Sequence, residues 1–406
     1  MLKSKSLFLS YDGLTDPLGQ SQVLPYLEGL SKEFKIYIIS FEKKERYDAQ
    51  KDAILKKCEK AGIIWCPLMY HKNPPVLSTL FDIYQMYALS RRLILGKAIN
   101  LVHARSYISG LVALWLKAKF NVAYIFDIRG FWPEERVEGG IWNLNNKLYK
   151  KVFTFFKRRE VDLFTKANAV ISLTYKAKDI LLNRKELNLV GDKVTVIPCC
   201  ADLDHFQKLF VNDTLKVLRE KLSIAENQFV LTYCGSIGTW YMLEEMLSFF
   251  NQLTLIKPDS VFLFVTKEPA SVILDKCQKF NIQESSIRVI SATYGEVPQY
   301  LSIADASVYF IRPSYSKQAS SPTKQAELLA MNIPIITNAG VGDSDKILKD
   351  VGILVNDFEP DTLRLAGEKL VLKSEEKTES RFLAKEYYSL EKGISKYKMI
   401  YNKILN

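Results

Sequence analysis

The segment Ser321–Glu327 holds residue types that can bind a phosphate and a sugar. Ser321 is a good helix N-cap and Pro322 suits the first helical position, so we expect a helix to begin here. The N–H groups of its first turn attract a phosphate, and the Lys324 ammonium adds charge. Glu327, on the same helix face, can accept hydrogen bonds from a ribose diol. The alternative is a surface capping motif, but a lysine in the first turn opposes the helix dipole. The pattern therefore favours a nucleotide-diphosphate site.

Two glycine-containing loops could bring backbone N–H groups close to the same ligand. The first, Tyr11–Ser21, contains Gly13 and Gly19, and the second is Gly235-Ser-Ile-Gly-Thr-Trp240. Glycine permits close approach, and a glycine loop leading into a helix can hold phosphate or sugar hydroxyls. The first loop has neither the dinucleotide-binding pattern nor the P-loop pattern, so NAD and ATP binding gain no support. Each loop could also be a plain strand-to-helix turn.

Charges of both signs follow another strand-like run, in Asp127–Arg136. Asp127 and Arg129 are predicted to project from the strand end, and Glu135 follows in the same loop with aromatic residues between them. Such a mixture suits sugar recognition, and a solvated salt-bridged loop is the alternative. His103 also follows a strand, and a lone histidine is more often structural than catalytic.

Cysteine and histidine usage argues against a metal or disulfide framework. The chain has six cysteines and three histidines, without a C-x-x-C pair. A zinc site and a disulfide scaffold are therefore not expected in a chain of 406 residues, and reduced cytosol fits best. The apolar run near the N-terminus is too short for a signal peptide, and no stretch approaches the roughly 18 apolar residues of a spanning helix. We expect a cytoplasmic protein.

The net charge of +11 is unevenly spread. Residues 1–210 hold 33 Lys and Arg against 21 Asp and Glu, whereas residues 211–406 hold 23 against 24. The first half is therefore expected to meet a membrane surface, a nucleic acid or a phosphate-bearing substrate, unless the charge serves solubility alone. The basic, amphipathic run Lys147–Arg159 could lie on an anionic bilayer or pack its apolar face on the core. No nucleic-acid recognition module accompanies it.

Strand-like and helical runs alternate along the chain, which predicts an α/β fold with two doubly wound parallel sheets. Helical patterns include Gln22–Phe34, Leu243–Leu255 and a final run, Ser380–Asn406. The two halves meet at Pro198–Phe206. The expected strands are 7–11, 36–41, 63–68, 101–104, 123–127, 169–173 and 194–198 in the first half, and 229–234, 261–265, 287–291, 306–311, 333–337 and 352–355 in the second.

Together these motifs resemble the retaining glycosyltransferases of family 4, which have the GT-B fold of two Rossmann-like domains. The most specific parts are Gly13-Leu-Thr-Asp-Pro-Leu-Gly-Gln-Ser-Gln22, the connection Val194–Phe206, Ser321-Pro-Thr-Lys with Glu327, and Gly340-Val-Gly-Asp343. The resemblance implies an acceptor-binding domain at 1–198, a nucleotide-sugar-binding domain at 199–385 and a helix at 386–406 that packs back toward the first domain.

Three positions depart from the family pattern. The family's first glutamate would fall at Ala319. The Arg and Lys that often follow the glycine loop are missing from Thr239–Phe250. Asp127 stands where members often have a histidine facing the donor sugar. These departures leave the donor sugar open, with Lys324 as the obvious phosphate ligand and Arg312 as a lesser one.

The resemblance implies a metal-independent enzyme that moves a sugar, hexosyl or related, from a UDP- or GDP-linked donor to a hydroxyl of a glycan or lipid-linked acceptor in surface polysaccharide or glycolipid synthesis. No other cofactor is expected. Lys324, Asp127 and Arg312 are the candidate catalytic residues, and acceptor positioning is assigned to Arg105, Asp127, Arg129 and Glu135. Donor binding is assigned to Gly19, Gly235, Ser236, Gly238, Thr239, Ser321, Thr323, Lys324 and Glu327.

Two other functions remain open at this point. A non-catalytic glycan- or nucleotide-binding partner protein would explain Ala319, and a nucleotide-sugar epimerase would need acid and base groups that three histidines hardly supply. For location, the alternative to free cytoplasm is a peripheral position on the inner face of the cell membrane through residues 147–159.

Overall fold

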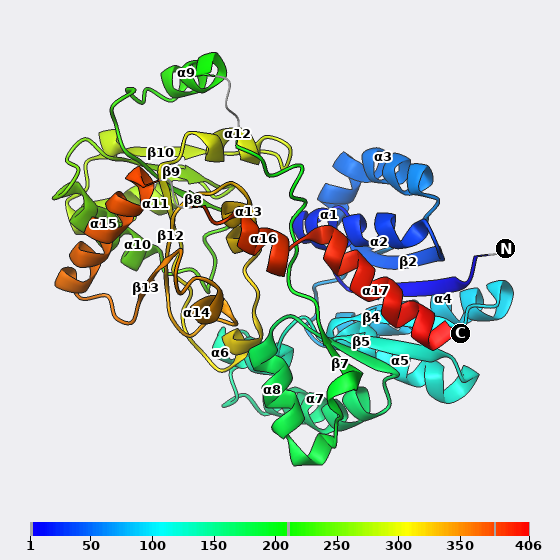
Figure 1. Ribbon diagram of the computed structural model, residues 1–406. Coiled ribbons are helices and arrows are strands. Elements are labelled where there is room, and N and C mark those ends of the chain that lie inside the picture. The colour runs from blue at the N-terminus through cyan, green and yellow to red at the C-terminus, as the bar shows by residue number, and fades with distance from the viewer. Residues whose placement is uncertain (1–2, 209–211, 377–378, 406) are drawn as a thin grey trace. The chain divides into compact units, whose positions relative to one another are not determined.

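The computed structural model describes residues 3–208, 212–376 and 379–405, and the parts of the predicted domains at 1–2, 209–211, 377–378 and 406 lie outside the described residues. Two compact units are present: residues up to Pro198 together with the segment from Leu390 form unit 1, and Cys199–Ser389 form unit 2 (Figure 1). The division falls after Pro198 and after Ser389.

Unit 1 is built on a parallel sheet of seven strands in the order β3-β2-β1-β4-β5-β6-β7. Nearly every residue of its central strands is buried, as in sheets covered by helices on both faces. The strands are β1 Lys5–Ser10, β2 Lys35–Glu42, β3 Ile64–Met69, β4 Leu101–Arg105, β5 Ala123–Asp127, β6 Ala169–Ser172 and β7 Val194–Val196. The helices are α1 Pro17–Gln22, α2 Leu24–Ser31, α3 Lys44–Ala61, α4 Leu77–Lys97, α5 Ser106–Phe120, α6 Trp132–Glu138, α7 Lys147–Thr165, α8 Tyr175–Asn183 and α17 Leu390–Leu405, with 3₁₀ turns at Lys185–Leu187 and Gly191–Lys193.

Unit 2 repeats the design with six parallel strands in the order β10-β9-β8-β11-β12-β13. The strands are β8 Val230–Cys234, β9 Val261–Val265, β10 Ile287–Ile290, β11 Ala306–Val308, β12 Ile335–Asn338 and β13 Ile353–Val355. The helices are α9 Asn212–Lys221, α10 Leu243–Thr254, α11 Ala270–Cys277, α12 Val297–Ser302, α13 Thr323–Ala330, α14 Ser344–Ile347, α15 Pro360–Glu375 and α16 Arg381–Tyr387, with 3₁₀ turns at Gln278–Phe280, Glu284–Ser286 and Ser316–Ala319.

Both sheets reverse their strand order at one point, between β1 and β4 in unit 1 and between β8 and β11 in unit 2. Open α/β sheets bind ligands beyond the carboxyl ends of the strands at such a point. In unit 2 the loops that follow β8 and β11 are therefore the place to look for a site. They include the Gly235 loop and the segment around Arg312.

The alternation of strands and helices predicted from the sequence is confirmed, but four local predictions were wrong. The loop 11–21 ends in α1, and the helix expected at 22–34 is two helices divided at Val23. The second half of the loop 127–136 is α6. The final helical run is divided into α16 and α17.

The C-terminal helix α17 belongs to unit 1 because it packs on α2. A Cβ atom on Gly29 would lie 2.5 Å from a side-chain carbon of Ile394, so only glycine allows this close approach. The ring of Tyr397 meets Tyr26 edge-on at 5.3 Å, and the Tyr401 hydroxyl lies 2.9 Å from Nδ1 of His103. The helix thereby reaches the middle of β4, where His103 lies.

Candidate functional site

Lys324 lies in the first turn of α13 with its ammonium inside unit 2. The residue is 5% exposed, and Nζ lies 3.6 Å from the centre of the Tyr241 ring and 4.1 Å from that of Tyr233. Nζ has no hydrogen-bond partner among the described residues. A buried ammonium held only by ring faces lacks the polar partners that such groups normally have. An anionic ligand would supply them.

Gly235 closes the other side of this ammonium. A Cβ atom there would lie 3.2 Å from Nζ of Lys324, and the φ angle of Gly235 is +126°, which side-chain-bearing residues rarely adopt. The Gly235 N–H donates to the Val265 carbonyl at 3.0 Å, which fixes the loop to the neighbouring strand. The glycine loop and the lysine thus form one packed arrangement at the point where the sheet order reverses.

Burial changes the protonation of the Lys324–Glu327 pair. Desolvation lowers the pKa of Lys324 to about 7, although Cys234 and Glu327 oppose the change. Desolvation raises the pKa of the half-buried Glu327 to about 7, and the charge of Lys324 only partly offsets this. Both groups are therefore poised to change charge near neutral pH when a ligand alters their surroundings.

Two further cations lie on the face of Trp240, at the end of the glycine loop. The guanidinium carbon of Arg312 is 4.9 Å from the ring centre and Nζ of Lys317 is 3.8 Å from it. The Arg312 N–H donates to the Trp240 carbonyl at 2.9 Å, so the segments after β8 and β11 are joined here. The site is positive although unit 2 as a whole holds 20 Lys and Arg against 25 Asp and Glu.

Gln325 fixes the orientation of α13. Its Oε1 accepts from the hydroxyls of Tyr309 at 2.8 Å and Ser344 at 2.6 Å, and its Nε2 donates to the Tyr388 hydroxyl at 2.8 Å. This buried, satisfied network ties the helix to the end of β11, to α14 and to the segment before α17. It determines the direction in which Lys324 points.

The other donor residues predicted from the sequence lie around this arrangement. Ser236, Gly238 and Thr239 are exposed on the glycine loop, and Thr323 is half-buried. Ser321 is not the N-cap that we expected: Pro322 occupies that position, and the Ser321 hydroxyl instead accepts from the Cys199 N–H at 3.1 Å. The Ser321 hydroxyl oxygen thus binds the backbone of the connection at Cys199, and α13 begins without a side-chain cap.

The position predicted to lack the family's first glutamate is occupied by a completely buried alanine, Ala319. It lies in the 3₁₀ turn Ser316–Ala319, with Lys317 on the same short turn. Sequence reasoning missed the two tyrosines that hold Lys324. Their only signal was an aromatic residue at each end of the glycine loop, Tyr233 and Tyr241.

In unit 1, Asp127 is buried at the end of β5, with 2% of its surface exposed. Its Oδ2 accepts from the Tyr397 hydroxyl at 2.9 Å and lies 3.6 Å from Nε2 of His103 and 3.9 Å from the Arg129 guanidinium. Burial alone would raise the pKa of this carboxyl, but Arg129 and His103 hold it below its usual value. The other carboxylate oxygen, Oδ1, is buried and has no hydrogen-bond partner among the described residues.

The remaining predicted acceptor residues are only partly brought together. Arg105 pairs with Asp12, and a cavity of about 10 Å³ lies beside Arg105, Asp127 and Tyr397. That volume suits a single water molecule. Glu135 is half-buried in the first turn of α6.

The first glycine loop is already occupied by a side chain of unit 1. The buried Glu42 carboxylate accepts from the Leu14 N–H at 2.9 Å and from the Thr15 N–H at 3.0 Å, so these groups do not await a ligand. Gly19 lies in α1, where a Cβ atom would lie 2.0 Å from the Gly13 carbonyl oxygen. The structure therefore gives Gly19 a packing role, and its contact with a donor stays a prediction.

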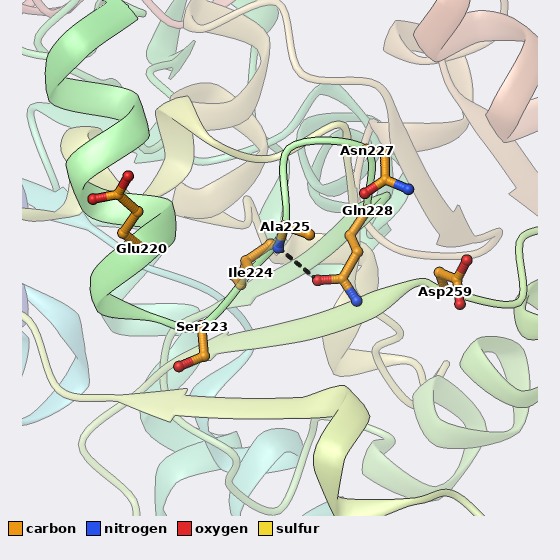
Figure 2. A pocket seen from close by; sticks show the side chains of 7 residues that line it. All are labelled: Glu220, Ser223, Ile224, Ala225, Asn227, Gln228 and Asp259. Carbon is orange, nitrogen blue, oxygen red and sulfur yellow. Dashed lines mark hydrogen bonds between the residues drawn. The ribbon is translucent and has the colours of Figure 1, made fainter.

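A hollow of about 490 Å³ in unit 2 does not match the predicted chemistry. It is lined by residues that include Glu220, Gln228 and Asp259, where the strands of unit 2 begin (Figure 2). Its acidic lining would repel a phosphate. The described histidines, cysteines, aspartates and glutamates form no group of three placed to hold a metal ion. Within the described ranges, no helix has the length and apolar character needed to span a membrane.

Comparison with known proteins identifies the family of one segment of the chain. Residues 26–205 match the model of Glycosyltransferase Family 4. This segment is a glycosyltransferase family 4 domain. The resemblance inferred from the motifs is thereby confirmed. Among curated proteins, none matches the sequence significantly.

Solved structures resemble the whole chain. Sucrose-phosphate synthase from Thermosynechococcus elongatus is similar with a TM-score of 0.74 and 14% identity, over 99% of both chains. Anabaena HepE, in complex with UDP and glucose, gives 0.71 and 12%, over 98% of this chain and 99% of that one. The lipopolysaccharide outer core galactosyltransferase WaaB gives 0.63 and 11%, over 98% and 99%. The two parallel sheets therefore form a GT-B fold, and the family-model match to residues 26–205 supports glycosyltransferase function.

Proposed function

We propose that the protein is a retaining glycosyltransferase that moves a sugar from a nucleotide-diphosphate sugar to a hydroxyl of a glycan or lipid-linked acceptor, in surface polysaccharide or glycolipid synthesis. One observation carries the proposal. The Lys324 ammonium is buried beside the Gly235 loop at the start of α13, and it has no hydrogen-bond partner among the residues described. A diphosphate is the anion that this position suits.

The donor would be held by groups that the structure gathers in unit 2. Lys324 and the N–H groups at the start of α13 would bind the diphosphate, and Arg312 would add positive charge from beside Trp240. Glu327, one turn along α13, would accept hydrogen bonds from the ribose hydroxyls. The positive charge that Lys324 regains when the diphosphate binds would favour the ionised form of the Glu327 carboxylate. UDP- or GDP-linked sugars are the proposed donors.

The chemistry needs little from the protein beyond positive charge. The acceptor hydroxyl oxygen forms a bond to the anomeric carbon while the bond from that carbon to the diphosphate breaks. The hydroxyl proton passes to the leaving phosphate, and attack from the face of departure retains the anomeric configuration. Lys324 and the α13 N-terminus stabilise the charge that develops on the leaving group. Asp127, Arg105, Arg129 and Glu135 are proposed to position the acceptor from unit 1.

The residues of α7 extend the proposal to the cell membrane. Of the residues exposed on this helix, Lys147, Lys150, Lys151, Arg158 and Arg159 are cationic and none is acidic. Unit 1 holds 36 Lys and Arg against 20 Asp and Glu. A surface of this charge suits an anionic bilayer that presents a lipid-linked acceptor. We therefore propose a cytoplasmic, peripheral location.

Thermal unfolding with a panel of UDP-, GDP-, ADP- and CMP-sugars tests the donor site. A ligand at about 100 times its dissociation constant adds about 2.7 kcal/mol to the free energy of unfolding. We expect stabilisation by one nucleotide class, abolished in Lys324→Met and kept in Lys349→Met, which changes an exposed lysine of the same unit. The assignment of Lys324 to the donor site would be refuted if no nucleotide sugar raised the melting temperature. It would also be refuted if Lys324→Met kept the increase. The anomeric configuration of the product, read by NMR, tests retention.

A second candidate function rests on Ala319. With alanine where the family's first glutamate would stand, the chain could bind a nucleotide sugar without transferring it. This reading predicts stabilisation by the donor but no product with any hydroxyl acceptor. Restoration of the carboxylate in Ala319→Glu would then be the decisive comparison, provided that the variant folds.

A further inference from the structure

The helix α4 turns an apolar face outward. Apart from Gly96 and Lys97 at its C-terminal end, the exposed residues of α4 lie within an arc of about 120° when 100° is assigned to each residue. Five of them are large and well exposed: Leu77 at 63%, Leu80 at 55%, Phe81 at 52%, Tyr84 at 67% and Leu95 at 62%. Together with the exposed Ala88, Arg91 and Arg92, they form the surface that we call the α4 face.

The side of α4 that faces the core is, by contrast, partly polar. Asp82 is completely buried there and accepts from the Tyr11 hydroxyl at 2.8 Å and from the His71 backbone N–H at 3.2 Å. Its other oxygen lies 2.6 Å from Nδ1 of His71. The buried Ser90 hydroxyl donates to the Met86 carbonyl. The helix therefore cannot turn its apolar residues inward without leaving a buried carboxylate outside its network.

This arrangement reverses the usual pattern of a surface helix, which buries its apolar stripe and exposes charge. An exposed apolar patch of this kind marks an interaction surface. The charges on it are both arginines, and the one acidic residue of α4 is the buried Asp82. The face thus combines apolar side chains with positive charge alone.

The neighbouring helices continue the same chemistry. Helix α5 packs against both α4 and α7 (Figure 1). It exposes Trp115, whose ring meets Tyr87 of α4 edge-on at 6.4 Å. The exposed residues of α7 are the five cations described above together with Leu148, Thr154 and Phe155. Apolar side chains and polybasic charge thus lie on adjacent helices of one unit.

We propose that the α4 face inserts its apolar side chains into an anionic lipid bilayer. Stable attachment of a protein to a membrane surface commonly needs two contributions, apolar insertion and electrostatic attraction. The α4 face would supply the first and α7 the second. A second copy of the chain suits this face less well, because a symmetric contact would bring Arg91 and Arg92 of both copies together with no acidic residue of α4 to pair them. The proposal does not depend on the transfer chemistry.

Sedimentation with vesicles of phosphatidylcholine, with and without phosphatidylglycerol, tests this inference. The protein is expected to bind the anionic vesicles. The variant Leu80→Ser, Phe81→Ser, Tyr84→Ser should bind at least about tenfold more weakly, because each side chain loses its transfer from water to lipid. The matched control is Leu365→Ser, Leu372→Ser, which removes two similarly exposed leucines from α15 of unit 2 and should change nothing.

A second measurement locates the contact. The tryptophan fluorescence added in Tyr84→Trp, relative to the unchanged protein, should be quenched by vesicles with brominated acyl chains. The fluorescence added in Leu365→Trp should not be quenched. The inference is overturned if the triple variant binds vesicles as well as the unchanged protein does, or if the unchanged protein binds neither kind of vesicle. It is also overturned if sedimentation velocity shows a dimer of the unchanged protein and a monomer of the triple variant. Nucleotide-induced thermal stabilisation, measured on the same triple variant, shows that it folds and tests the donor site separately.

Discussion

A Cβ atom on Gly235 would lie 3.2 Å from the ammonium nitrogen of Lys324. Gly235 also has a φ of +126°, so an alanine there meets backbone strain as well as crowding. We expect Gly235→Ala to lower the free energy of unfolding by about 1–3 kcal/mol and to displace Lys324. Gly238→Ala is the control, because nothing lies within 4 Å of its Cβ position. Equal urea midpoints for the two variants would contradict the packed arrangement.

Replacing Lys324 by methionine should separate stability from function. The ligand-free protein holds a buried ammonium without a hydrogen-bond partner in the described part of the chain, so Lys324→Met should be as stable or more stable by about 1–3 kcal/mol. Transfer should fall by roughly 10²–10³-fold, as for removal of one preorganised electrostatic group. Denaturant unfolding and initial rates give the two numbers. A variant that is much less stable would show that the ammonium is satisfied.

The stability gain of Lys324→Met should depend on pH. The folded pKa of Lys324 is about 7 and its ordinary value is 10.5, so between these values the unfolded chain binds more protons than the folded one. The contribution of Lys324 to stability therefore becomes less unfavourable as pH rises through this window. The difference between the two proteins should be largest below pH 7 and shrink toward pH 10. A constant difference would contradict the lowered pKa.

Donor binding should take up a proton above neutral pH. A bound diphosphate restores the charged form of Lys324, whose pKa is about 7 in the ligand-free protein. At pH 8, titration calorimetry in buffers of different ionisation enthalpy should show uptake approaching one proton, with affinity falling as pH rises. In Lys324→Arg the guanidinium stays charged, so any binding that survives should lack this uptake. Proton release in the original protein would be incompatible with the proposed contact.

In unit 1, loss of the Tyr397 hydroxyl should destabilise the fold. It donates at 2.9 Å to the buried Asp127, so Tyr397→Phe leaves that carboxylate with one acceptor site unfilled. We expect a cost of about 1–3 kcal/mol in the free energy of unfolding. Tyr84→Phe, which changes a hydroxyl on an exposed ring, should cost nothing measurable. Equal melting temperatures for both variants would argue against the bond.

Much of the fold could be predicted from the sequence because parallel strands buried on both faces appear as short, continuous apolar runs. Val261–Val265 and Ala123–Asp127 have the bounds that we expected. Element ends that depend on tertiary contacts could not be predicted. Ser321 looks like an N-cap, but its hydroxyl accepts from Cys199, which is distant in sequence.

The sequence by itself determined the two α/β units, the family resemblance and the Lys324–Glu327 pair, because these follow from local patterns. Only the tertiary structure decided the surroundings of Lys324, since Tyr233, Tyr241 and Gly235 reach it from another strand end. It likewise showed that Glu42 fills the first glycine loop and that Asp127 is bound by Tyr397, 270 residues away. Burial and hydrogen-bond partners are properties of chain segments brought together by packing, and no local pattern encodes them.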